Sequence, residues 1–173
     1  WYLDNLGSDW ANAAADNLKE YGRILEVPQQ RDFYRTHVQN ADTRVFVIIS
    51  DAMRYEVAAT LSEELRRETQ AEVKLSSCEG IFPTVTMFGM TALLPHKELT
   101  AELKSNGVVG VLADGQPTDA QYRDGILKKA NPASVALKYK DIIKMKRAER
   151  SALVKGMDVV YIYHDKIDET SHT

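Results

Sequence analysis

Apolar and polar positions follow a helical period at the start of the chain. The apolar residues recur there at steps of three and four, which places them on one face of a long helix. They are Leu3, Leu6, Trp10, Ala14, Leu18, Tyr21 and Leu25. Pro28 closes this helix, and a second short helix is predicted at about 30–38. A polar turn at 40–42 then separates an N-terminal helical segment, residues 1–42, from a second unit, residues 43–173.

Two continuous apolar runs, RVFVIIS (44–50) and DVVYIY (158–163), are typical of strands buried on both faces of a parallel sheet. We expect both to be central strands. After the first run, apolar residues repeat every four positions up to Glu68, which predicts a helix that follows the strand directly. These residues are Met53, Val57, Leu61 and Leu65.

Weaker patterns fill the middle of the chain. Further strands are predicted at 71–77, 108–113 and 134–137, and helices at 86–94, 119–130 and 140–155. Strands that alternate with helices imply right-handed crossovers. The expected fold class is therefore α/β, with a mostly parallel sheet flanked by helices and preceded by the N-terminal helices.

Composition narrows the class of protein. With 44% hydrophobic and 27% charged residues, the chain resembles an ordinary globular domain. The longest apolar runs reach five residues, whereas a membrane-spanning helix needs about 20, so no membrane span is expected. One cysteine, Cys78, cannot form an internal disulfide, which favours a reducing, cytoplasmic setting. Because Trp1 is not a methionine and already lies in a helical pattern, we expect the native start upstream.

Charge is unevenly distributed along the chain. Residues 128–155 hold nine Lys and Arg against Asp141 and Glu149, although the whole chain has a net charge of −3. Such a segment can face a polyanion such as nucleic acid. The commoner explanation is a solvated, lysine-rich helix, and the sequence leaves both open.

Ligands of parallel sheets bind beyond the carboxyl ends of the strands. Asp51 is predicted to lie at such an end, where it would either cap the following helix or act as a hard ligand for a divalent metal. Arg54, one turn later, would pair either with a phosphate or with a nearby acid such as Glu56.

Thr84 and Thr86 stand at a turn that leads into an apolar helix. A hydroxyl at a helix start is either a cap or a nucleophile, since the N-terminal N–H groups stabilise a phosphate and an attacking oxygen. After the last strand, Asp168 and His172 are four residues apart and could bind one metal together. The alternative is a polar loop without a ligand.

Three strings carry a resemblance to a known family: FVIISDAMRYEVA (46–58), FPTVTMFGMTALLPHK (82–97) and VYIYHDKID (160–168). Together they resemble the PglZ domain of bacterial phage-growth-limitation and BREX phage-defence systems, a family placed in the alkaline phosphatase superfamily. The resemblance runs from about Arg31 to the end of the chain.

The resemblance implies a metal-dependent phosphohydrolase, either a phosphatase or a phosphodiesterase. It implies two divalent cations, zinc or manganese, with Asp51 as a ligand of one and Asp168 and His172 as ligands of the other. Thr86 would be the nucleophile between the metals, and Arg54 would orient the phosphate. The Asp-His-Gly segment and further His that complete both sites in the superfamily are absent, so we expect an incomplete core, truncated at its C-terminus.

One other function stays open, because the same fold could serve as a non-catalytic interaction domain among other phage-defence proteins. A third possibility, a receiver-like domain phosphorylated at Asp51, is disfavoured, because it would need an acidic pair at the end of its first strand and no segment supplies one. The expected ligands are a phosphate ester substrate, nucleic acid included.

Overall fold

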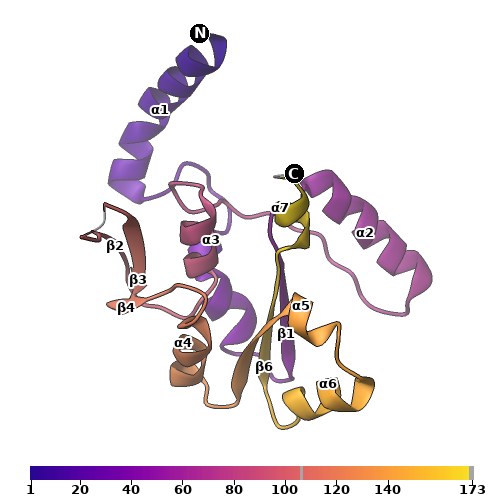
Figure 1. The fold of residues 1–173 in the computed structure, drawn as a ribbon. Coiled ribbons are helices and arrows are strands. Elements are labelled where there is room, and N and C mark those ends of the chain that lie inside the picture. Colours follow the sequence, from indigo (N-terminus) through magenta and orange to yellow (C-terminus); the bar gives the residue numbers. More distant parts are fainter. Residues whose placement is uncertain (106, 172–173) are drawn as a thin grey trace.

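The computed structural model describes residues 1–105 and 107–171 (Figure 1). The elements in chain order are α1 (Tyr2–Tyr21), the 3-10 turn η1 (Gln30–Asp32), the π-helical turn η2 (Tyr34–Val38), β1 (Val45–Ser50), α2 (Tyr55–Glu68), α3 (Thr86–Ala92), β2 (Leu99–Leu103), β3 (Val109–Ala113), β4 (Gln116–Pro117), α4 (Arg123–Ala130), β5 (Ser134–Lys138), α5 (Tyr139–Ile142), α6 (Arg147–Val154), β6 (Val159–His164) and α7 (Lys166–Ser171). The expected α/β fold class is confirmed.

The main sheet has three strands in the order β1-β6-β5, and both pairs are parallel. Its middle strand, β6, contains Val159, Val160 and Tyr161, all buried, as the continuous apolar run predicts. The expectation for β1 was wrong. Among the described residues β1 lies at the edge of the sheet, and its Phe46 and Ile48 are exposed while Val47 and Ile49 are buried.

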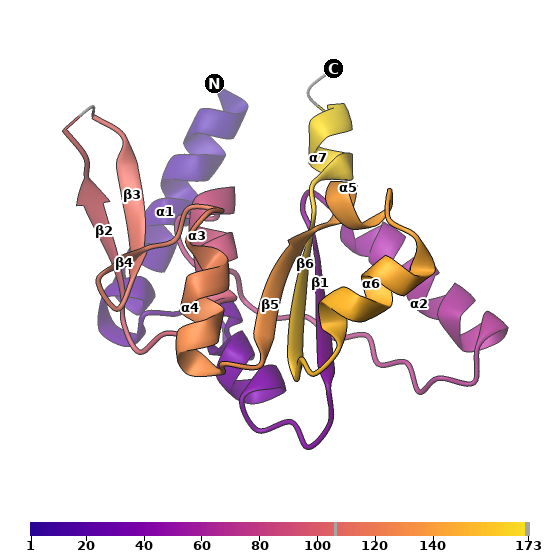
Figure 2. The ribbon, with the colours of Figure 1, turned by 60° about the horizontal axis from the view of Figure 1, so that its bottom comes forward.

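The hydrophobic core lies on one face of this sheet. Here the inward side chains of β1 and β6 pack against η2, α4 and the end of α3. The buried members of the core are Tyr34, Val38, Val47, Ile49, Leu94, Ile126, Leu127, Val159 and Tyr161. On the other face, α6 lies over β5 and β6, because Leu153 and Val154 line a cavity together with Leu137 and Ile162 (Figure 2).

A second, antiparallel sheet was not expected. Its order is β2-β3-β4, so the predicted strand at 108–113 forms as β3 but belongs to a hairpin beside the main sheet (Figure 2). The predicted strand at 71–77 does not form, since these residues have no strand partner and most are exposed. The basic stretch at 140–155 is broken into α5 and α6 rather than one helix.

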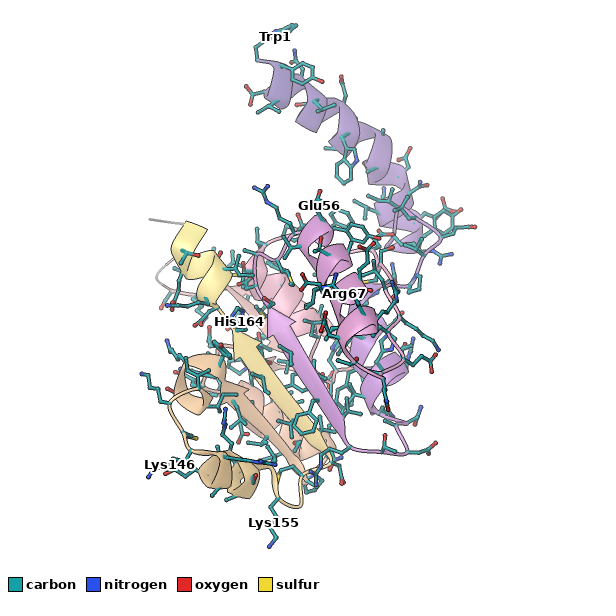
Figure 3. All side chains as sticks on the ribbon, turned by 90° about the vertical axis from the view of Figure 1, so that its right-hand side faces the viewer. Trp1, Glu56, Arg67, Lys146, Lys155 and His164 are labelled. Atoms are coloured by element: carbon teal, nitrogen blue, oxygen red, sulfur yellow. The ribbon has the colours of Figure 1, made fainter. Side chains whose placement is uncertain are left out.

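Two helices stand away from the body. α1 ends at Tyr21, earlier than expected, because Gly22 adopts the left-handed conformation that closes a helix. It projects outward in Figures 1 and 3, and of its apolar stripe only Ala14 is buried. α2 likewise leaves Val57, Leu61 and Leu65 exposed. Neither stripe packs on the sheet in the way its period predicts.

Candidate active site

Asp51 lies where the sequence predicts, directly after β1 at the carboxyl edge of the parallel sheet. Its backbone N–H donates to the carbonyl of His164 at 3.0 Å, which fixes it beside the end of β6. The carboxylate accepts the N–H of Ala52 at 3.0 Å, and Ala52 has a positive φ of 58°. α2 starts only at Tyr55, so Asp51 does not cap it, and the helix-cap alternative is wrong.

His164 lies in the polar stretch after the last strand that the sequence placed at this edge, but the family resemblance gave it no role. Its Nδ1 lies 3.0 Å from the Ser50 hydroxyl, and the edge of its ring meets the Tyr139 ring at 4.5 Å between centroids. Ser50 and His164 are register partners at the ends of β1 and β6. The signal was present, because both residues end apolar strands whose carboxyl ends share one edge.

The edge also carries Asp165, whose carboxylate lies 3.8 Å from the Lys140 ammonium. Both side chains are about half exposed, so the pair contributes little stability. It does place a cation beside the Asp165 carboxylate. The strand ends therefore bring carboxylate, imidazole and ammonium groups to the same edge of the sheet.

Thr86 is the first residue of α3 and is exposed. The N-cap position is Val85, and no side chain caps the helix, so the cap alternative for Thr86 is wrong. Within the described residues its hydroxyl makes no recorded hydrogen bond. α3 itself is firmly held, since the Tyr161 hydroxyl donates to the carbonyl of Leu93 at 2.8 Å and Gln30 Nε2 donates to the carbonyl of Gly89 at 3.3 Å.

The other predicted site residues are dispersed or lie outside the described part. Arg54 is exposed at the N-cap position of α2, and no ion pair with Glu56 forms. Asp168 lies in α7, half-exposed. His172 lies outside the described residues, so its pairing with Asp168 stays a prediction.

Across residues 1–105 and 107–171, no group of three or more His, Cys, Asp or Glu side chains is arranged to hold a metal ion. Zinc centres use three or four protein ligands. These residues alone therefore do not fit a complete metal centre, although Asp51 and His164 are donors of the right chemical kind. Of the helices in the described ranges, none has the length and apolar character to cross a membrane.

Comparison with known proteins agrees with the family resemblance seen in the sequence. The family model for the BREX system PglZ alkaline phosphatase-like domain matches residues 31–173. The chain is 41% identical over 180 residues, all of its own length, to the alkaline phosphatase-like protein BrxZ of Escherichia coli O9:H4 (strain HS). It is 38% identical over 170 residues, 96% of its length, to the alkaline phosphatase-like protein PglZ of Bacillus cereus (strain H3081.97).

The chain spans about a fifth of the length of these curated relatives, 20% in each case. No solved structure matches it. The family match covers most of the chain, including β1 with Asp51 and β6 with His164. The chain therefore belongs to the PglZ family of BREX system alkaline phosphatase-like domains.

Proposed function

We propose that the full-length protein is a metal-dependent phosphohydrolase, a phosphatase or phosphodiesterase, to which these residues contribute part of the active site. The position of Asp51 carries the proposal. Asp51 directly follows a parallel strand, and its backbone N–H is bonded to the carbonyl of His164, so it lies at the edge where parallel sheets bind ligands, in a chain of an alkaline phosphatase-like family.

The residue roles are those that the family resemblance implies. Asp51 binds one divalent cation, and Asp168 with His172 binds the other. Zinc or manganese fits this mixture of oxygen and nitrogen donors. The remaining ligands come from outside these 173 residues. When bound, such cations lower the pKa of an attacking hydroxyl and neutralise charge that develops on the phosphate.

Thr86 is the proposed nucleophile. Its oxygen attacks phosphorus, the ester oxygen leaves, and water then hydrolyses the phosphothreonine to release phosphate. Two observations support this choice, since the side chain is exposed and its hydroxyl is not used to cap α3. Arg54, also exposed, orients the phosphate oxygens.

A second candidate is a non-catalytic interaction domain that docks other proteins of the defence system. The observation in its favour is that no three-ligand metal cluster forms within the described residues. For either candidate we propose a cytoplasmic setting, supported by a single, exposed cysteine.

The two candidates separate in the full-length protein. Thr86→Ala should abolish hydrolysis of an aryl phosphate or aryl phosphodiester, and chelation should do the same to the unmodified protein. Stability should change by less than about 1 kcal/mol, because alanine has the higher helix propensity and no hydrogen bond is lost.

Thr84→Ala is the matched control, because Thr84 is also exposed but precedes α3 by two residues. It should keep its activity, and Thr86→Ser should retain part of the rate. Full activity in Thr86→Ala would remove Thr86 as nucleophile. Absence of hydrolysis in the unmodified, metal-loaded protein would favour the interaction domain.

A further inference from the structure

The segment that carries Thr86, residues 81–89, is held at both of its ends by one side chain. At its start, the backbone N–H of Ile81 donates to Oε1 of Gln30 at 3.2 Å. At its end, within α3, the carbonyl of Gly89 accepts a hydrogen bond from Nε2 of Gln30 at 3.3 Å. A single carboxamide therefore bridges the two ends of the segment, and Thr86 lies between them.

Gln30 is itself anchored by a short backbone pairing. Its N–H donates to the carbonyl of Glu79 at 2.8 Å, and the N–H of Glu79 donates to the carbonyl of Pro28 at 2.8 Å. The carboxamide lies close against the backbone of α3, because a Cβ added at Gly89 would be only 3.4 Å from Nε2. The side chain of Gln30 is half-buried in this position. Its two hydrogen bonds thus start from a fixed point of the chain.

The bond at Gly89 leads to Thr86 within one helical turn. The N–H of Gly89 donates to the carbonyl of Val85 at 3.1 Å, and Val85 directly precedes Thr86. α3 has seven residues and no side-chain cap. A helix this short depends on outside contacts for its stability and position. Loss of the bond from Gln30 should therefore displace the turn that carries the Thr86 hydroxyl.

We propose that Gln30 is a positioning residue for Thr86, which holds residues 81–89 so that the hydroxyl keeps the orientation needed to attack phosphorus. The inference rests on the proposed function, because it concerns the reaction assigned to Thr86. Gln30 acts through the backbone of the segment and not by contact with the phosphate. Displacing a reacting group by about 1 Å can cost roughly a hundredfold in rate. Gln30 precedes the residues that the family model matches, 31–173, so the family resemblance gives it no role.

Gln30→Met in the full-length protein tests this role, because methionine has a similar length but neither the amide donor nor the carbonyl acceptor. For an aryl phosphate, kcat should fall by roughly tenfold to a hundredfold while KM stays within about twofold, because the orientation of a nucleophile affects the chemical step. Gln29→Met is the matched control, since the Gln29 side chain bonds Gly22 and Arg31 instead. It should leave kcat and KM unchanged.

A second measurement does not require activity. Amide hydrogen exchange of residues 81–89, followed by mass spectrometry, should become about threefold or more faster in Gln30→Met, because the N–H of Ile81 loses its acceptor. Exchange in the main parallel sheet should stay unchanged. Gln30→Glu serves if Gln30→Met does not fold. It keeps an oxygen towards Ile81 but replaces the donor to Gly89 by a second oxygen, so kcat should fall as well.

Three outcomes overturn the positioning role. Unchanged kcat in the Gln30 variants would show that these hydrogen bonds do not orient Thr86. A loss of kcat with faster exchange throughout the sheet would make Gln30 a general stabilising residue. A higher KM with unchanged kcat would place its effect on substrate binding.

Failure of the proposed function looks different. In that case the unmodified, metal-loaded protein hydrolyses neither an aryl phosphate nor an aryl phosphodiester, and the role of Gln30 in the reaction falls with that of Thr86. Faster exchange confined to residues 81–89 in Gln30→Met would then show only that the two hydrogen bonds form. Hydrolysis by the unmodified protein with full activity in Gln30→Met rejects the positioning role alone.

Discussion

Two tyrosines on the core face of β6 differ in one hydrogen bond. The Tyr161 hydroxyl donates to the carbonyl of Leu93, at the end of α3, at 2.8 Å. The Tyr163 hydroxyl is buried and receives no hydrogen bond of good geometry, although the Arg123 guanidinium lies 4.6 Å from the ring centroid. Removing a paired hydroxyl costs stability, whereas removing an unpaired buried one does not.

We therefore expect Tyr161→Phe to lower the free energy of unfolding by about 1 kcal/mol. Tyr163→Phe should leave it unchanged or raise it, because the ring and its contact with Arg123 remain. Urea unfolding of both variants, followed by circular dichroism, measures the difference. An equal loss of unfolding free energy in the two variants would mean that the hydroxyl of Tyr163 has a hydrogen-bond partner in solution.

The same pair predicts alkaline sensitivity. Burial raises the pKa of Tyr161 well above 10, and burial raises the pKa of Tyr163 to about 12 against the opposing charge of Arg123. The folded state thus holds both protons more tightly than the unfolded state. This stabilisation is complete below pH 10 and is lost as the pH rises from 10 towards 12. Both phenylalanine variants should flatten that part of the stability profile.

At the scale of elements, Glu79 connects the segment after α1 to the body. Its buried carboxylate accepts the N–H groups of Ile24 at 2.7 Å and Leu25 at 2.8 Å. Its backbone also bonds Pro28 and Gln30, at 2.8 Å each. The stripe of α1 contributes little, with one ring contact of 5.6 Å between Trp10 and Phe82. The position of α1 therefore depends strongly on this carboxylate.

Glu79→Ala should free the segment after Gly22 by removing two charge-assisted hydrogen bonds, each worth roughly 1.5–3 kcal/mol. Trypsin should then cleave after Arg23 several times faster, measured by mass spectrometry as release of residues 1–23. Glu72→Ala is the control, because Glu72 is exposed and forms a surface ion pair with Lys74 at 3.0 Å. An unchanged cleavage rate in Glu79→Ala would show that other contacts hold α1.

The elements also show what local pattern can and cannot predict. The runs that became β1 and β6 were recognisable because a continuous apolar run rich in β-branched residues is typical of a buried strand, and Asp51 could be placed at a strand end for the same reason. The alternation at 71–77 is equally strand-like, yet a strand needs a partner, and these residues pair with none of the described strands. The hairpin partner of β3, Leu99–Leu103, was missed although its apolar and polar residues alternate.

Tertiary placement limited the prediction of the site. Ser50 and His164 meet only because β1 and β6 pair in register. The sequence shows that each residue ends an apolar strand, but it does not show that these two strands, 114 residues apart, are neighbours. The edge position of β1 was missed for a similar reason. A continuous apolar run predicts that both faces of a strand are buried. It does not show which segments cover those faces, or whether the strand has a neighbour on each side.

At the scale of the whole molecule, the basic segment runs from the candidate site to the opposite end of the sheet. Lys140 pairs with Asp165 at the carboxyl edge, 3.8 Å away, whereas Lys146 and Lys155 lie at the far end from His164 in Figure 3. The segment also divides, since Lys128 belongs to α4 and pairs there with Asp124 at 2.6 Å. A polyanion bound along α5 and α6 would therefore lead towards the candidate site.

If the basic segment along α5 and α6 binds nucleic acid, its affinity should fall steeply as the salt concentration rises, because each neutralised phosphate releases a counterion. Replacing Lys144, Lys146 and Arg147 by glutamine should weaken binding and reduce the slope of log K against log salt by about 2 for a single strand, at about 0.7 per phosphate contact. Lys128→Gln is the control, since its ammonium is already paired on another element. Fluorescence anisotropy with a labelled oligonucleotide, at salt concentrations from about 25 to about 200 mM, measures the slopes for the triple variant and the unmodified chain. Absence of binding at the lowest salt, or equal slopes in the triple variant and the unmodified chain, would identify α5 and α6 as a solvated basic surface.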